Sequence, residues 1–337
     1  MRAAVLGASG YAGSELLRLM HGHGELELVF AGADSAANTP IASHVASLAA
    51  AYPSTVFSPH GAIYNSDAEV VFCALPHGIS QQYVVQLRKE GRYVVDLGAD
   101  FRLKNPDDYA EWYHQEHQSP EFLADAVYAL VERHRDELPG ATLLAVPGCF
   151  PTAAALALGP FVDAGWVKKS GIVVNSLSGT SGAGRASSDR LHFSRLHANA
   201  EAYGLLDHRH TIEMQQELGV SLLFTPHLVP VSRGMLSTAY APMSSSHSSS
   251  EALAMLRDTY ANDPFVVVVD EAPTMKDPLG SNLCFLSARV DERTGWLIAM
   301  SSLDNLTKGA AGQAVQAFNL AMNWPETLGL ASAGVTP

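Results

Sequence analysis

The chain has 337 residues, of which 47% are hydrophobic and 16% charged, and its formal net charge is −13. This composition predicts a folded protein with material for two domains and excludes a disordered chain. The acidic balance and the lack of basic runs disfavour nucleic acid and anionic membranes as partners. No apolar run approaches the roughly 20 residues of a membrane span. Three widely spaced cysteines favour a reducing, cytoplasmic setting, and the histidine spacings predict no metal site.

The first part of the chain alternates short apolar runs with helix-like segments. Strands are expected at 3–6, 26–33, 69–75, 93–97 and 143–146, and helices at 14–21 and 80–90. The near-continuous apolar run at 69–75 is typical of a parallel strand that is covered on both faces. This alternation predicts an α/β fold with a Rossmann-like, doubly wound parallel sheet.

The pattern changes after residue 149. A helix is expected over 152–164, and strands follow at 171–177, 220–224, 236–240, 265–269, 283–290 and 296–301. Consecutive strands with few long helices predict an α+β domain with a mainly antiparallel sheet. We therefore expect a first domain at 1–148, completed by a C-terminal helical segment at 305–337, and a second domain at 149–304.

Glycines 7, 10 and 13 stand between the first expected strand and the first helix. This spacing predicts a dinucleotide site, because a tight turn lets a pyrophosphate reach the amides at a helix N-terminus. A plain glycine-rich turn is the alternative. Asp34, near the end of the second strand, favours the ribose hydroxyls of NAD, whereas Ser35 could donate to the extra phosphate of NADP.

Cys149 follows Gly148 and precedes an expected helix. A thiol at a helix N-terminus meets the positive end of the macrodipole and backbone N–H donors, which favour the thiolate. A thiolate nucleophile needs an acid or base nearby, and His208 and His210 precede another helix-like stretch at 211–218. The alternatives are a buried structural cysteine and a pair of helix-capping histidines. The other two cysteines lie in apolar runs and are expected to be structural.

Several motifs, taken in chain order, resemble those of one family. They are Gly7-Ala-Ser-Gly-Tyr-Ala-Gly13 and the segments 74–78, 96–102, 147–152, 181–185, 208–211, 226–230 and 304–313. In these segments the sequence resembles the N-acetyl-gamma-glutamyl-phosphate reductase family, of the same broad group as aspartate-semialdehyde dehydrogenase. The resemblance covers nearly the whole chain. One departure is Ile212, which stands where the family's His-Arg-His-x-Pro-Glu motif has proline.

The resemblance implies a reaction and roles for several residues. N-acetyl-glutamyl phosphate would be reduced to the semialdehyde through a thioester on Cys149, with His210 as first and His208 as second choice for the acid/base. Arginine forks suit phosphate and carboxylate groups. The implied substrate-binding residues are Arg102, Arg185 and Arg209.

The resemblance also implies NADP as cofactor, while Asp34 leaves NAD open. The implied cofactor-binding residues are Gly7, Ser9, Gly10, Tyr11, Ala12, Gly13, Ser35, Pro76, Ser181, Gly182 and Asn305, the last at the nicotinamide amide. The implied assembly is a cytoplasmic homo-oligomer, a dimer or tetramer, with the second, catalytic and dimerisation domain as its contact surface.

Three other functions stay open. A homologous reductase of lysine biosynthesis would act on aminoadipyl phosphate held on an acidic carrier protein, but it should need a basic docking surface, which a net charge of −13 disfavours. A non-catalytic NADP sensor on this fold would not need both Cys149 and the histidine pair. A metal hydrolase would be sensitive to chelators and independent of reduced cofactor.

Overall fold

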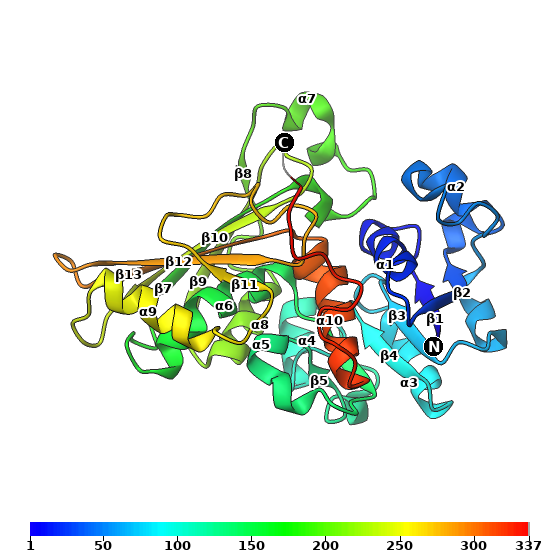
Figure 1. Ribbon diagram of the computed structural model, residues 1–337, viewed down its shortest axis with the longest axis horizontal. Coiled ribbons are helices and arrows are strands. Elements are labelled where there is room, and N and C mark those ends of the chain that lie inside the picture. Colours follow the sequence, from blue (N-terminus) through cyan, green and yellow to red (C-terminus); the bar gives the residue numbers. More distant parts are fainter. Residues whose placement is uncertain (336–337) are drawn as a thin grey trace. The chain divides into compact units, whose positions relative to one another are not determined.

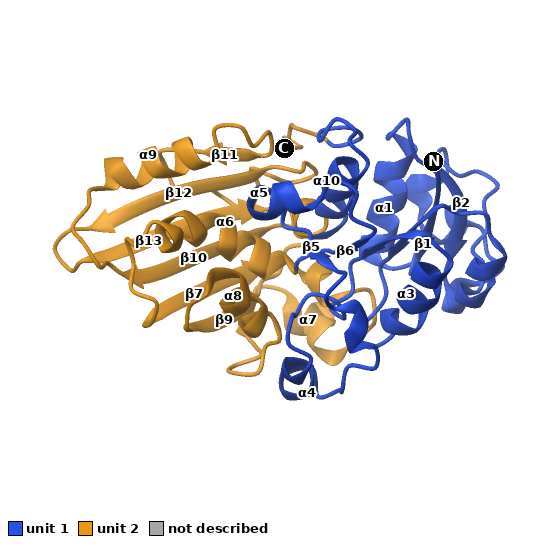
Figure 2. Cartoon of the chain, turned by 90° about the horizontal axis from the view of Figure 1, so that it is seen from below, with its two compact units in different colours: residues 1–147, 310–330 blue, residues 148–309, 331–337 orange. Residues whose placement is uncertain are grey.

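The computed structural model describes residues 1–335 and divides into two compact units (Figures 1 and 2). Unit 1 contains Met1–Pro147 and Ala310–Leu330, drawn blue in Figure 2, and unit 2 contains Gly148–Gly309 and residues 331–335. The expected boundary differs from this division by one residue at 148. At the C-terminal end, residues 305–309 and 331–335 group with unit 2, although we expected them in the first domain.

A six-stranded sheet with strand order β2-β1-β3-β4-β6-β5 forms the centre of unit 1. All of its pairings are parallel, as the sequence predicts. The strands are β1 (Arg2–Leu6), β2 (Glu27–Gly32), β3 (Val70–Cys73), β4 (Tyr93–Asp96), β5 (Val127–Tyr128) and β6 (Leu143–Ala145). The helices are α1 (Tyr11–His21), α2 (Ile41–His44), α3 (Ser80–Lys89), α4 (Asp107–Tyr113), α5 (Val131–His134) and α10 (Gly312–Ala321).

β1 lies between β2 and β3, so the chain leaves it in opposite directions along the sheet. In open α/β sheets, ligands bind outside the carboxyl ends of the strands at such a switch point. The glycine turn 7–13 follows β1 there. α10 completes this unit, because the ring of Phe318 packs edge-on against Phe72 of β3 and Tyr93 of β4.

Unit 2 contains a seven-stranded sheet with order β11-β12-β13-β10-β7-β9-β8. Its strands are β7 (Ile172–Ser178), β8 (Glu201–Ala202), β9 (Leu222–Leu228), β10 (Met235–Pro242), β11 (Val266–Val268), β12 (Cys284–Asp291) and β13 (Trp296–Leu303). Its helices are α6 (Cys149–Asp163), α7 (Phe193–Leu196), α8 (His210–Leu218) and α9 (Ser249–Thr259). Four of its pairings are antiparallel, which confirms the expected character. β7/β9 and β11/β12 are parallel.

The two faces of this second sheet differ. Burial alternates strictly along β7 and β10, as expected of strands with one covered face. α6 packs on the covered face, where the Ser301 hydroxyl donates to the Ala153 carbonyl oxygen over 2.7 Å. The other face presents partly exposed apolar side chains in register, with Tyr240 opposite both Val173 and Ile298.

Two helices begin elsewhere than the sequence suggested. α6 begins at Cys149, three residues before the expected start, because Gly148 is extended (φ −66°, ψ 154°) and Pro151 fits the first turn. The C-terminal helix begins with a π-helical turn at Thr307–Ala311 and becomes α-helical only from Gly312. Within residues 1–335, none of the helices combines the length and the apolar character needed to cross a bilayer.

Candidate active site

The glycine turn of unit 1 has room for backbone but not for side chains. Gly7 has a φ of +76°, and a Cβ there would collide with the Ala74 carbonyl. A Cβ on Gly13 would collide with the Gly7 carbonyl, which accepts the Gly10 N–H over 3.0 Å. Gly10 caps α1 without a side chain. The turn therefore fits a pyrophosphate that approaches the amides at the start of α1.

The other expected cofactor residues of unit 1 lie at the same sheet edge. They follow β1, β2 and β3, which are parallel neighbours and so end on one side. Ser9 and Ala12 are half-buried in the glycine turn, while Tyr11 is exposed at the start of α1. Ser35 is exposed in the 3-10 turn η1 (Asp34–Ala36), and Pro76 is exposed after β3.

His60, at the start of the 3-10 turn η3 (His60–Asn65), joins Asp34 to the glycine turn. The Gly7 N–H donates to His60 Nε2 over 3.1 Å, so the ring proton resides on Nδ1. His60 Nδ1–H donates to Asp34 Oδ2 over 2.9 Å, and the His60 backbone N–H donates to Asp34 Oδ1 over 2.7 Å. The backbone hydrogen bond is the main reason that the pKa of Asp34 lies below its usual value.

The motifs at 74–78 and 96–102 meet around a buried carboxylate pair. Asp100 accepts the Gly78 N–H at Oδ1 over 2.7 Å and the Ser80 hydroxyl at Oδ2 over 2.6 Å. Burial, and then the charge of Asp100, raises the pKa of Asp96 to about 7. Arg102 is only 8% exposed and donates from Nη2 to the Leu97 carbonyl over 2.9 Å.

In unit 2, Cys149 is the first residue of α6 and is half-buried. The preceding residue, Gly148, donates its N–H to Oε1 of the fully buried Glu213 over 2.8 Å. A Cβ on Gly148 would lie 2.5 Å from His210 Nε2, so the imidazole rests directly against this glycine. A Cβ on Gly309 would lie 2.7 Å from Cys149 Cβ. The turn that carries the thiol is therefore closely surrounded by these residues.

The two expected histidines lie together at the start of α8. Their rings are 4.8 Å apart, and Phe150 contacts both of them. The His210 N–H donates to His208 Nδ1 over 3.2 Å, which places the ring proton of His208 on Nε2. Burial, and then the positive charge of Arg209, lowers the pKa of His208 to about 4. His208 is therefore neutral at physiological pH.

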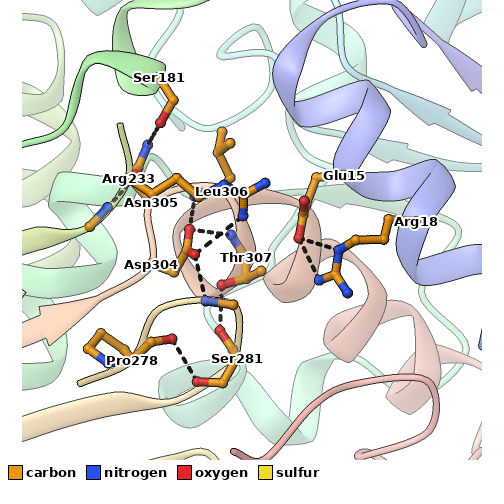
Figure 3. A network of polar contacts seen from close by, with 12 residues as sticks. Glu15, Arg18, Ser181, Arg233, Pro278, Ser281, Asp304, Asn305, Leu306 and Thr307 are labelled. Carbon is orange, nitrogen blue, oxygen red and sulfur yellow. Dashed lines mark hydrogen bonds and ion pairs between the residues drawn. The ribbon is translucent and has the colours of Figure 1, made fainter. Parts of the chain in front are cut away.

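Asp304 and Asn305 organise a polar network in unit 2 (Figure 3). Asp304 is fully buried and accepts two backbone N–H groups at Oδ1, and the Gly280 N–H and the Arg233 guanidinium at Oδ2. Asn305 accepts the Gly234 N–H and donates from Nδ2 to the Ser181 hydroxyl, both over 2.9 Å. Asn305 thus fastens the loop that contains Ser181 and Gly182, the two expected cofactor residues of this unit.

The expected substrate arginines are divided between the units. Arg102 belongs to unit 1, whereas Arg185 and Arg209 belong to unit 2. Arg185 is exposed in the loop after Ser181, and Arg209 is half-buried at the N-cap of α8. None of the three cysteines forms a disulfide within residues 1–335. Across residues 1–335, no group of three or more His, Cys, Asp or Glu side chains is arranged to hold a metal ion.

Three residues of these sites, Glu213, Gly309 and His60, were not among the predicted site residues. Glu213 had a usable signal, because it follows His210 by three positions and so shares its helix face. Gly309 and His60 carried no local signal, since each matters through a contact with a residue distant in sequence.

Two family models, which together match most of the chain, place it in the semialdehyde dehydrogenase class. The family model "Semialdehyde dehydrogenase, NAD binding domain" matches residues 2–141, and "Semialdehyde dehydrogenase, dimerisation domain" matches residues 149–305. Aspartate semialdehyde dehydrogenase II from Vibrio cholerae, complexed with ASA, is similar in structure with a TM-score of 0.72 and 17% identity, over 95% of this chain and 97% of that chain. The enzyme from Candida albicans with NADP gives a TM-score of 0.69, 16% identity and the same coverage. These structures show the shared fold.

Sequences that are more similar to this chain than those solved structures identify the particular family within this class. N-acetyl-gamma-glutamyl-phosphate reductase from Heliobacterium modesticaldum is 39% identical over 350 residues, with 100% of both chains covered. The proteins of that name from Symbiobacterium thermophilum and Magnetococcus marinus are each 41% identical, with coverage of 98% or more of either chain. The chain belongs to the N-acetyl-gamma-glutamyl-phosphate reductase family, which confirms the resemblance drawn from its motifs.

Proposed function

We propose that this chain catalyses the NADPH-dependent reduction of N-acetyl-glutamyl 5-phosphate to N-acetyl-glutamate 5-semialdehyde and phosphate, a step of arginine biosynthesis. The observation that carries the proposal is the Cys149 turn. Cys149 is the first residue of α6, and the His210 imidazole lies against the preceding glycine. A cysteine nucleophile beside an imidazole is what acyl transfer to sulfur requires. Relatives of full length at 39–41% identity carry the name of this activity.

The first half of the reaction makes a thioester. The thiolate of Cys149 attacks the carbonyl carbon of the acyl phosphate, an S–C bond forms, and the C–O bond to phosphate breaks. Inorganic phosphate leaves with the electron pair. The position of Cys149 at the first residue of α6 stabilises the thiolate, because the positive end of the helix dipole favours negative charge there.

The second half releases the aldehyde. When bound at the glycine turn of unit 1, NADPH would supply the hydride that reduces the thioester on Cys149 to a thiohemiacetal. His210 gives a proton to the carbonyl oxygen as charge develops on it and takes the proton back as the C–S bond breaks, which restores the thiolate. His208 is neutral, because its pKa is about 4, so it acts by accepting the His210 N–H and holding the start of α8.

The remaining residues bind and orient. Unit 1 is the proposed dinucleotide domain, and its glycine turn holds the pyrophosphate with Ser9, Tyr11, Ala12, Ser35 and Pro76 around it. Unit 2 is the proposed catalytic domain, in which the loop at Ser181 and Gly182, held by Asn305, would help to bind the nicotinamide. Arg102, Arg185 and Arg209 are the proposed ligands of the phosphate and carboxylate groups of the substrate.

The open face of the second sheet supports a homo-oligomer, a dimer or tetramer. Val173, Tyr240 and Ile298 form an apolar, partly exposed surface on strands that are otherwise well packed. Exposed apolar surface of this kind is typical of an interface. We place the reaction in the reducing cytoplasm, because the nucleophile works only as a free thiol.

The reverse reaction tests this function most directly. The purified protein is mixed with N-acetyl-glutamate 5-semialdehyde, inorganic phosphate and NADP, and the formation of NADPH is followed by its absorbance. We expect reduction of NADP that depends on both phosphate and the aldehyde, and slower reduction of NAD. Activity that ignores phosphate would contradict the acyl-phosphate chemistry. Negligible turnover of free N-acetyl-glutamyl phosphate in the forward direction would favour the carrier-bound aminoadipyl substrate instead.

A further inference from the structure

Asp34 stands where a dinucleotide domain commonly has the carboxylate that selects NAD. Such a carboxylate accepts hydrogen bonds from the ribose hydroxyls, and its charge repels the 2′-phosphate of NADP. Taken alone, Asp34 therefore contradicts a preference for NADPH. Its side chain is 63% exposed, so burial does not remove its charge, and its pKa is lowered, so it is ionised at neutral pH.

His60 occupies both oxygens of this carboxylate. The backbone N–H of His60 donates to Oδ1 over 2.7 Å and its ring Nδ1–H donates to Oδ2 over 2.9 Å. Hydrogen bonds to a carboxylate are among the strong ones, and two of them from one residue fix its orientation. Asp34 can turn toward a ribose only by breaking the contact with the ring.

The His60 ring is itself held firmly. Its side chain is 13% exposed, its Nε2 accepts the Gly7 N–H, and Tyr83 packs edge-on against it with ring centroids 6.0 Å apart. A Cβ on Gly32 would lie 2.9 Å from His60 Cδ2, so the ring also fills the space that this glycine leaves open. The ring thus links the carboxylate to the backbone of the dinucleotide turn.

We propose that His60 is a specificity-determining residue, which restrains Asp34 beside the glycine turn and so lets unit 1 accept the 2′-phosphate of NADPH. This inference rests on one part of the proposed function, the preference of the protein for NADPH over NADH. With the carboxylate oriented by two hydrogen bonds from His60, Asp34 is a poorer acceptor for the ribose hydroxyls of NADH, and the neighbouring Ser35 hydroxyl is available to meet the phosphate. Removing the His60 side chain releases Asp34 to accept hydrogen bonds from the ribose hydroxyls, as such a carboxylate does in NAD-binding domains.

Direct binding to the full chain tests this, with dissociation constants for NADPH and for NADH measured by calorimetry. We expect the unaltered protein to bind NADPH more tightly. In His60→Ala, the ratio of the two constants should move about tenfold or more toward NADH, since the freed charge opposes the phosphate and serves the ribose. Loss of the Gly7 contact weakens both dinucleotides alike and cancels in the ratio.

Two variants of Asp34 complete the test. The double variant His60→Ala/Asp34→Ser should restore the preference for NADPH, because the carboxylate that His60→Ala releases is no longer present. Asp34→Ser alone should change the ratio by no more than about threefold, because the carboxylate is already engaged. An unchanged ratio in His60→Ala would overturn the proposal. A loss of NADH affinity of about tenfold in Asp34→Ser alone would also overturn it, because the carboxylate would then already serve the ribose. Asp34 is exposed, so this variant is expected to fold and gives a result even if the His60 variant does not fold.

These measurements need no acyl phosphate. If N-acetyl-glutamyl phosphate is not the substrate, the binding ratios still decide the role of His60. If the unaltered protein prefers NADH, the role of His60 is refuted and the acyl-phosphate chemistry is left to the kinetic assay.

Discussion

Glu213 and Gly148 are joined by a buried hydrogen bond, in which the Gly148 N–H donates to Glu213 Oε1 over 2.8 Å. His210, one turn earlier on the same helix, rests against the same glycine. α8 therefore holds the backbone next to the nucleophile with one side chain and places the imidazole with another. A shift of either helix would change both contacts at once.

This pairing predicts that Glu213 is a positioning residue whose amide substitute works. Glu213→Gln keeps an oxygen that can accept the Gly148 N–H, so we expect kcat within about tenfold of normal. Glu213→Ala leaves that N–H buried without an acceptor and should lower kcat by about 10²-fold, the effect of a small misplacement of a catalytic group. It should also lower the free energy of unfolding by about 1–3 kcal/mol. Equal losses in both variants would mean that the charge, not the hydrogen bond, is what counts.

Gly309 gives a second test of how closely the thiol is positioned. In Gly309→Ala the new methyl would lie 2.7 Å from Cys149 Cβ and 3.1 Å from Leu303 Cδ1, so either the cysteine or the backbone at residue 309 must shift. We expect kcat to fall by about 10–100-fold while NADPH binding is unchanged. Gly61→Ala is the matched control, because a Cβ there meets nothing within 4 Å. Normal kcat in Gly309→Ala would show that the turn can relax around the methyl.

The two histidines should differ in their effect on the pH dependence of the rate. The pKa of His208 is lowered to about 4, so above that pH it is deprotonated and is not the proton donor. His208→Asn keeps an acceptor near the position of Nδ1 and should retain the wild-type shape of the profile of kcat/KM between pH 5 and 9, at a reduced rate. His210→Asn should lose one limb of it. A limb that vanishes with His208 instead would reverse the two roles.

What the sequence could reveal was local. The glycine turn and the helix that starts at Cys149 follow from turn chemistry and helix N-terminal preferences, so both were predictable to within a few residues. The contact of His60 with Asp34 and that of Glu213 with Gly148 were not, because these partners lie 26 and 65 residues apart and are brought close only by packing of the finished fold, although the position of Glu213 on the His210 face of its helix was readable. The same limit applies to the sheet of unit 2. Strand positions follow from periodicity, whereas the parallel pairing of β7 with β9 depends on the path of the chain between them.

The open sheet face predicts that oligomerisation depends on apolar side chains of β10 and β13. Ile298 lies directly opposite Tyr240 on that face. Ile298→Arg would place a charge in the proposed interface, where an unpaired ion is costly, so we expect light scattering coupled to size exclusion to show a mass reduced toward one chain. Phe193→Arg is the control, because Phe193 is 76% exposed on α7 and does not belong to β10 or β13. An unchanged mass in Ile298→Arg would place the interface elsewhere.

Removal of the sulfur tests the covalent mechanism itself. Cys149→Ala and Cys149→Ser should each lower kcat by more than about 10³-fold, because the thioester pathway is lost and a serine hydroxyl is hardly ionised at neutral pH. NADPH affinity should remain, since the glycine turn belongs to unit 1. Cys284→Ala, in the buried part of β12, is the matched control and should keep the rate near normal. Near-normal turnover in Cys149→Ala would refute the mechanism. The other two cysteines among the described residues, Cys73 and Cys284, are fully buried and could not replace the nucleophile.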